Sequence, residues 1–134
     1  MSTELPEYFF RVRENGAFVF KVDTQNRHRR IEMDQIAVVN TKNGDIKPHG
    51  DRTLSNQDMA AISDWLAERQ ELLSARQIDD ILRAVDTLNY TAHWVQKDAD
   101  DHQLEMVTDS LLMAMHDLRT LLVRKKAERL IRED

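Results

Sequence analysis

The chain has 134 residues, 41% of them apolar and 32% charged, which is enough apolar material for the core of a single domain spanning residues 1–134. The absence of cysteine excludes disulfides, thiolate metal ligands and cysteine nucleophiles, and a formal net charge of −5 gives no overall attraction to nucleic acid or to an anionic membrane. Because no apolar run reaches the ~20 residues that span a bilayer, and residues 1–7 lack a secretory pattern, we expect a cytoplasmic protein with no membrane contact.

The first 53 residues predict an antiparallel β-meander of three to five short strands. The segments rich in aromatic and β-branched residues are 8–13, 17–22, 29–33, 35–40 and 46–47. The fourth segment is either a strand of its own or the continuation of the third. Pro48 limits the last segment to a short edge strand, because proline cannot donate to a ladder.

The clearest local signal is the Asn-Gly dipeptide at 15–16, which lies between the first two strand segments. Both residues tolerate the positive φ that a type I′ turn requires, so this dipeptide predicts a tight hairpin. A two-residue turn there places Arg13 opposite Phe18. It also places Arg11 opposite Phe20, so we expect both rings to lie beside arginine stems.

The remaining chain, residues 54–134, predicts three amphipathic helices that pack on the sheet. Ser55 and Asp58 form a short-armed capping box, which starts the first helix. Ser74 and Gln77 repeat this spacing, so we expect the chain to fold back there into a second helix. The segregation of strands and helices along the chain predicts an α+β fold.

The second and third helices are marked by their periodicity. Apolar residues recur at helical spacing from Ile78 to Val95, and this pattern ends near Lys97. Asp100 and Gln103 form a third capping box. The third helix therefore starts at this point and extends for about thirty residues.

The third predicted helix contains five consecutive apolar residues, 111–115, which cover every side of a helix. Such a helix must be covered all round, either within the monomer or by a second copy in a homodimer. Leu112 lies off the main stripe and is expected at the dimer seam. Alternatively this face binds a different protein, because the flexible side chains of Met113 and Met115 can repack around varied partners. The candidate protein interface is Leu111, Leu112, Met113, Met115 and Trp94.

The densest basic cluster lies in the predicted turn between the second and third strands. The candidate phosphate-binding residues are Arg27, His28, Arg29 and Arg30. Guanidinium groups bind phosphate in a bidentate manner; the competing interpretation is a solvated turn that resists edge-to-edge pairing. Phe18 and Phe20 are the aromatic residues available to stack on bases, and we expect core packing to bury them instead.

No motif for catalysis stands out. The chain has three glycines, no phosphate loop and no G-x-S-x-G elbow, and neither long helix contains the Glu-x-x-His pair of bundle metal sites. We therefore expect no catalytic residues, no metal and no cofactor. The leading hypothesis is a small regulatory or adaptor protein that binds a protein partner or itself through its helical face. The alternatives are a nucleic-acid-binding regulator and an enzyme with an unrecognised site.

Overall fold

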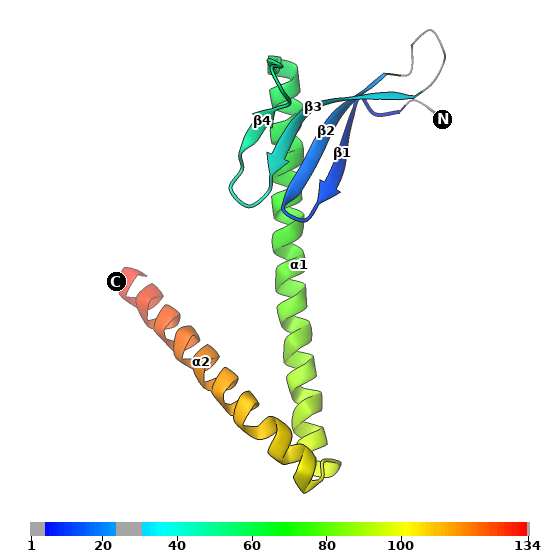
Figure 1. The fold of residues 1–134 in the computed structure, drawn as a ribbon. Coiled ribbons are helices and arrows are strands. Elements are labelled where there is room, and N and C mark those ends of the chain that lie inside the picture. Colours follow the sequence, from blue (N-terminus) through cyan, green and yellow to red (C-terminus); the bar gives the residue numbers. More distant parts are fainter. Residues whose placement is uncertain (1–4, 24–30, 134) are drawn as a thin grey trace. The chain divides into compact units, whose positions relative to one another are not determined.

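The computed structural model describes residues 5–23 and 31–133 and has an α+β fold (Figure 1). The strands are β1 (Tyr8–Arg13), β2 (Gly16–Asp23), β3 (Glu32–Asn40) and β4 (Ile46–Pro48), and the helices are α1 (Asn56–Lys97) and α2 (Asp101–Glu133). The strands form one antiparallel sheet in the order β1-β2-β3-β4, which confirms the predicted meander. The chain divides into two compact units, residues 1–80 and 81–134.

The first hairpin forms as predicted, but its turn is displaced. Arg13 pairs with Gly16 and Arg11 pairs with Phe18, so the register differs by two residues from the predicted one. The glycine belongs to the strand and does not have positive φ. A Cβ on Gly16 would lie 1.9 Å from the carbonyl oxygen of Val39. Glycine is therefore required here by the close approach of β3 and not by a type I′ turn.

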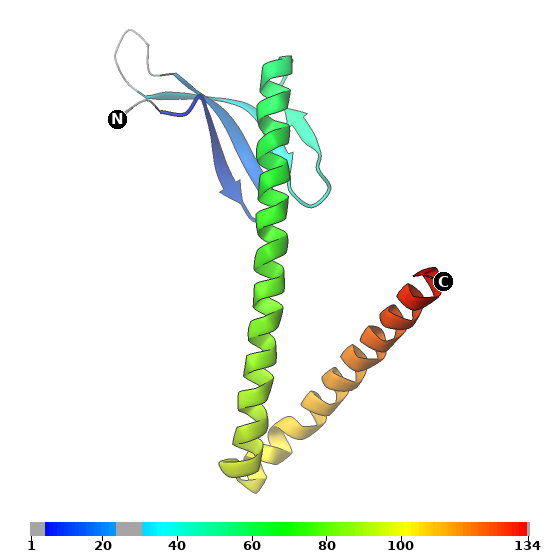
Figure 2. The same ribbon diagram turned by 180° about the vertical axis from the view of Figure 1, so that it is seen from behind.

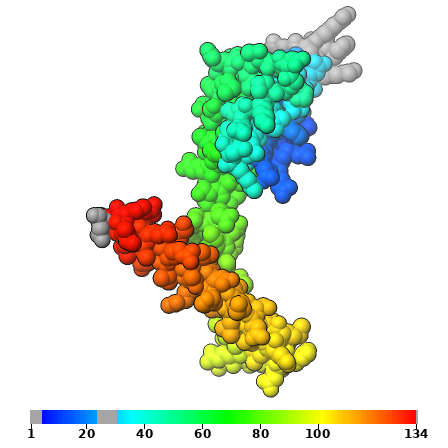
Figure 3. Space-filling view, turned by 60° about the vertical axis from the view of Figure 1, so that its left-hand side comes forward, coloured from blue at the N-terminus to red at the C-terminus, as the bar shows by residue number. Residues whose placement is uncertain are grey.

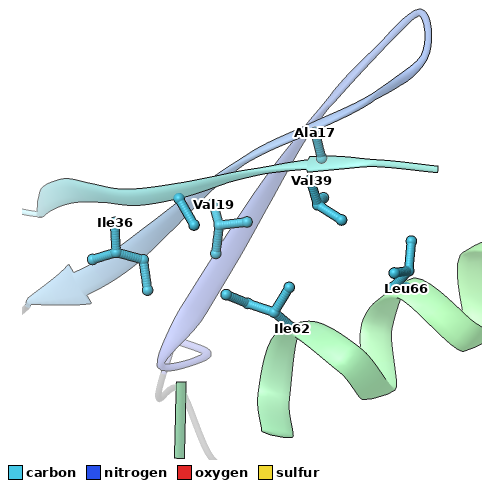
Figure 4. Close-up of a cluster of buried hydrophobic side chains, with 7 residues drawn as sticks. Ala17, Val19, Ile36, Val39, Ile62 and Leu66 are labelled. Carbon is cyan, nitrogen blue, oxygen red and sulfur yellow. The ribbon is translucent and has the colours of Figure 1, made fainter. Parts of the chain in front are cut away.

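The core of the first unit forms between one sheet face and the start of α1 (Figures 1, 2 and 4). Its fully buried side chains with the largest volumes are Ile36, Ile62, Val19 and Val39. The β2–β3 register shifts between Val19 and Phe20, so that Ile36 has no direct partner. This bulge lets Ile36 and its neighbour Ala37 both be buried, which strict alternation along a strand would prevent.

Residues 35–40 continue the third strand, as one of the two predicted alternatives stated. Asn40 ends this strand and organises the turn that follows, because its side-chain oxygen accepts hydrogen bonds from the amides of Lys42 and Asn43 at 2.8 and 3.1 Å. Gly44 has φ +81°, a conformation that side chains strongly disfavour. The Asn-Gly pair at 43–44 therefore lies in the turn between β3 and β4.

The start of α1 is fixed by the predicted capping box. The amide of Asp58 donates to Oγ of Ser55 at 3.0 Å, and the amide of Ser55 donates back to Oδ2 of Asp58 at 3.2 Å. From this start, Ile62 and Leu66 reach the sheet and are 0% and 8% exposed (Figure 4). Trp65 stacks on Phe10 with ring centroids 4.5 Å apart.

The prediction of three helices is wrong, because α1 continues without a break from Asn56 to Lys97, a length of 42 residues. Ser74 and Gln77 lie inside this helix and cap nothing. No Gly or Pro occurs near them, so the backbone hydrogen bonds continue, whereas a break would leave the amides and carbonyls at two new helix ends without helical partners. The predicted end at Lys97 and the predicted start of the last helix are confirmed.

Candidate protein-binding surface

The second compact unit contains the end of α1 and all of α2, and residues 81–133 of this unit are called the helical hairpin below. Two amides of the turn, those of Asp98 and Ala99, donate to the carbonyl oxygen of Trp94, each at 2.9 Å. The third predicted capping box then starts α2. The amide of Gln103 donates to Oδ1 of Asp100 at 2.8 Å, and the amide of Asp100 donates to Oε1 of Gln103 at 3.1 Å.

An apolar groove of about 320 Å³ lies between the two helices next to this turn. Its lining residues are Leu88, Thr91, Ala92, Val95, Leu104, Val107, Thr108, Leu111, Leu112 and Met115. Every one of these side chains is apolar or carries only a hydroxyl. The groove therefore suits an apolar side chain and offers no group for acid–base or metal chemistry.

None of the 33 residues of α2 is buried. The apolar side chains of its middle are among the most exposed, with Leu112 at 60%, Met113 at 63% and Met115 at 52%. Figure 3 shows the surface of α2 from its yellow start to its red end. The α1 part of the hairpin is similar, because Leu82, Val85 and other members of its predicted stripe are exposed.

The structure places the predicted interface residues unequally. Leu111, Leu112 and Met115 line the groove together. Met113 is exposed and does not line the groove, and Trp94 is half-buried beside the turn. The sequence interpretation missed the contribution of α1, namely Leu88, Ala92 and Val95. The available signal is their helical spacing, which places the three side chains on one face of the helix.

The sheet face opposite the core carries a different set of residues. Arg11 lies over the ring of Phe20 with its guanidinium carbon 4.6 Å from the ring centroid, and Arg13 lies over Phe18 at 5.0 Å. The predicted placement of the rings beside arginine stems is confirmed. The expectation that core packing buries both rings is confirmed for Phe20, which is 8% exposed, and is wrong for Phe18, which is only half-buried. Strand alternation puts both rings on the sheet face opposite the cluster around Ile62.

Asp58 lies at the centre of a cluster of polar and charged side chains. The Tyr8 hydroxyl donates to its Oδ1 at 2.6 Å and the Lys21 ammonium lies 3.3 Å from the same oxygen. The Tyr8 hydrogen bond, supported by donors from Ser55 and Lys21, lowers the pKa of Asp58 to about 2 although burial acts in the opposite direction. Burial and the neighbouring carboxylate raise the pKa of Tyr8 well above its ordinary value. This cluster joins β1 and β2 to the start of α1.

The candidate phosphate-binding residues 27–30 lie outside the described residues. Within residues 5–23 and 31–133, no three His, Asp or Glu side chains lie together in a group that could hold a metal ion. In the same part of the chain no helix has the length and apolarity to cross a membrane. Comparisons with protein-family models, with curated proteins and with solved structures gave no match for this chain.

Proposed function

We propose that this chain is a cytoplasmic, non-enzymatic protein-binding module with a regulatory or adaptor role, and that it acts through the helical hairpin. One observation carries the proposal: α2 has no buried residue, although its apolar side chains follow helical periodicity. An amphipathic helix is stabilised chiefly by packing of its apolar face. A face that no described residue of the chain buries is suited to a protein partner.

The magnitude of the exposed apolar surface supports this proposal. Residues 112–123 alone contain Leu112, Met113, Met115 and four further large apolar side chains that are more than half exposed. Covering each one removes apolar area worth about 25 cal/mol per Å², or roughly 1 kcal/mol for a half-exposed leucine. Isolated exposed leucines are ordinary, but a contiguous apolar stripe of this length marks an interaction surface.

Capture of binding partners from lysate with paired variants tests the proposal. Leu112→Glu with Met115→Glu adds two charges to the groove and should abolish capture of any protein bound by the wild-type chain. His116→Glu with Thr120→Glu adds the same two charges at exposed polar positions of α2 and should leave capture intact. Equal capture by wild type and both variants would show that the hairpin is not the binding surface.

One observation favours the nucleic-acid alternative. The charged residues that the four strands place on the sheet face opposite the core are all basic: Arg11, Arg13 and Lys47. Aromatic rings beside cations on a sheet face are typical of single-strand binding surfaces. In this protein, however, the guanidinium groups lie over the rings that bases would stack on. We therefore rank this alternative second.

Nuclease treatment and salt titration separate the two functions. Nucleic-acid binding by the sheet face and residues 27–30 predicts a gel shift that weakens steeply with salt through counterion release. Replacing Arg27, Arg29 and Arg30 by Gln should abolish this shift. Nuclease-resistant capture that is lost only in the Leu112 and Met115 variant supports protein binding.

A further inference from the structure

We infer that the partner of the helical hairpin is a second copy of this chain, with the two α2 helices antiparallel and crossing near Met115. This inference rests on the proposed function, because it names the occupant of the same apolar surface. It is carried by the distribution of charge along α2, by the position of the apolar run within that distribution, and by the area that the hairpin offers.

The charge of α2 changes sign at its middle. Residues 101–117 contain four acidic residues and no lysine or arginine, whereas residues 118–133 contain six basic residues and two acidic ones. The helix dipole favours acids only in the first turn and bases only in the last turn. It therefore does not account for Asp109 and Asp117 in the acidic half or for Arg119 in the basic half.

This distribution is complementary to itself in one orientation only. An antiparallel pair crossing at Met115 places position 101 opposite position 129 and position 105 opposite position 125. The acidic half of each helix then lies along the basic half of its partner, within the ~8 Å range over which charges interact at physiological salt. A parallel pair places acid beside acid and base beside base, which is repulsive.

The apolar run 111–115 lies at the centre of this arrangement. The stripe that contains it extends from Leu104 to Leu122, and the same face of the helix then carries Lys125 and Arg129. An antiparallel crossing brings the two apolar runs together. It moves the basic end of each stripe over the acidic start of the partner, so that no basic residue is forced into the apolar centre.

The hairpin also offers enough surface for a stable dimer. A helix of 33 residues is about 50 Å long and about 10 Å wide, so its stripe alone covers on the order of 500 Å². The exposed stripe on the end of α1, which includes Ile81 and Val85, adds a second strip within the same unit. The two strips together reach the buried area of a specific interface, which is about 800 Å² per partner.

Charge reversal tests the self-complementarity. Sedimentation equilibrium of the wild type should give a mass of twice 15.7 kDa. Asp101→Lys with Glu105→Lys, or Lys125→Glu with Arg129→Glu, should each raise the dimer dissociation constant at least tenfold, because each creates like charges at both ends of the pair. Combining all four substitutions in one chain should restore the wild-type constant. Failure of the combined variant to recover would overturn the charge argument.

Engineered cysteines test the orientation, because the chain has no cysteine of its own. Met115→Cys should crosslink two chains under mild oxidation. Leu104→Cys alone should not crosslink, because an antiparallel pair separates the two copies of residue 104, but it should crosslink when mixed with Lys126→Cys. Efficient self-crosslinking at both Leu104→Cys and Met115→Cys would establish a parallel pair and overturn the inference.

Two further outcomes separate this inference from the proposed function. A wild-type mass near 15.7 kDa at all concentrations, together with capture of another protein that the Leu112 and Met115 variant loses, overturns self-pairing and leaves the binding function in place. A monomer whose α2 amides are strongly protected from hydrogen exchange overturns both, because the stripe is then covered within one chain.

Discussion

The Asp58 carboxylate accepts hydrogen bonds from Tyr8 and Ser55 and forms an ion pair with Lys21. This single side chain therefore connects β1, β2 and the first turn of α1. Both residues that build the helix cap also appear in the sequence pattern. Nothing in the sequence, however, connects them to Tyr8, fifty positions earlier. Short-range hydrogen bonds could therefore be predicted, whereas contacts that depend on the placement of a distant strand could not.

The pKa of Asp58 predicts a specific acid sensitivity. Its value in the folded protein, about 2, lies below the ordinary 3.8, so the unfolded state binds more protons between these values. The stabilisation of the folded protein by the ionised Asp58 carboxylate is complete above about pH 4 and is lost as the pH falls through about 2. Urea unfolding followed by Trp65 fluorescence in a Trp94→Phe background should show this loss. Asp58→Asn should flatten it and lower stability at neutral pH by about 1–3 kcal/mol.

A matched control uses Asp64, an exposed carboxylate on the same helix. The Asp64→Asn variant should keep the stability of the wild type at neutral pH and its loss in acid. If Asp58→Asn and Asp64→Asn had the same pH profile, the buried cluster would contribute nothing to the acid response.

Gly16 and Gly44 allow a comparison of two reasons for glycine. Gly16→Ala puts a Cβ 1.9 Å from a carbonyl oxygen of the adjacent strand, which forces the β2–β3 pairing apart. Gly44→Ala meets no atom within 4 Å and only has to adopt positive φ, which costs about 1–2 kcal/mol. In urea unfolding, Gly16→Ala should therefore be the more destabilising of the two; the reverse order would contradict the strand spacing.

The three capping boxes show what a local pattern can and cannot predict. Those at Ser55 and Asp100 start helices, but the one at Ser74 lies inside α1. All three have the same spacing of polar residues. A capping box starts a helix only where the chain also has to change direction. This is the case before Ser55, where the linker leaves the sheet. Residues 73–77 have no such requirement, because every residue there is compatible with a helix.

Alanine substitutions at the first two boxes test this explanation. Ser55→Ala removes a used cap and should cost about 1 kcal/mol. Ser74→Ala replaces an interior helical serine by the best helix former and should stabilise α1 by a few tenths of a kcal/mol. Urea unfolding monitored by ellipticity at 222 nm measures both. A loss at Ser74→Ala as large as that at Ser55→Ala would show that the chain breaks there.

Across the whole molecule, the α+β fold class could be predicted, but the exposure of the helical stripes could not. Periodicity shows that one face of a helix is apolar; it does not show what covers this face. The same spacing at Ile62 and Leu66 leads to burial against the sheet, while at Val85 and Leu118 it leaves side chains about half exposed. The distinction depends on the available partner surface, which is a property of the folded assembly.

Protein concentration should therefore affect the two units differently. The core around Ile62 and Leu66 is made of residues 17–66 of one chain, so Trp65 fluorescence should report a thermal transition that is independent of concentration. Under the proposed self-pairing the helical hairpin gains its packing from a second copy, so by mass action its ellipticity and melting temperature should rise with concentration. Scans over a hundredfold range in a Trp94→Phe background measure both. Coincident transitions without concentration dependence would instead support one domain over residues 1–134 in which sheet and helices unfold together, because a stripe covered within the chain gains nothing from a second copy.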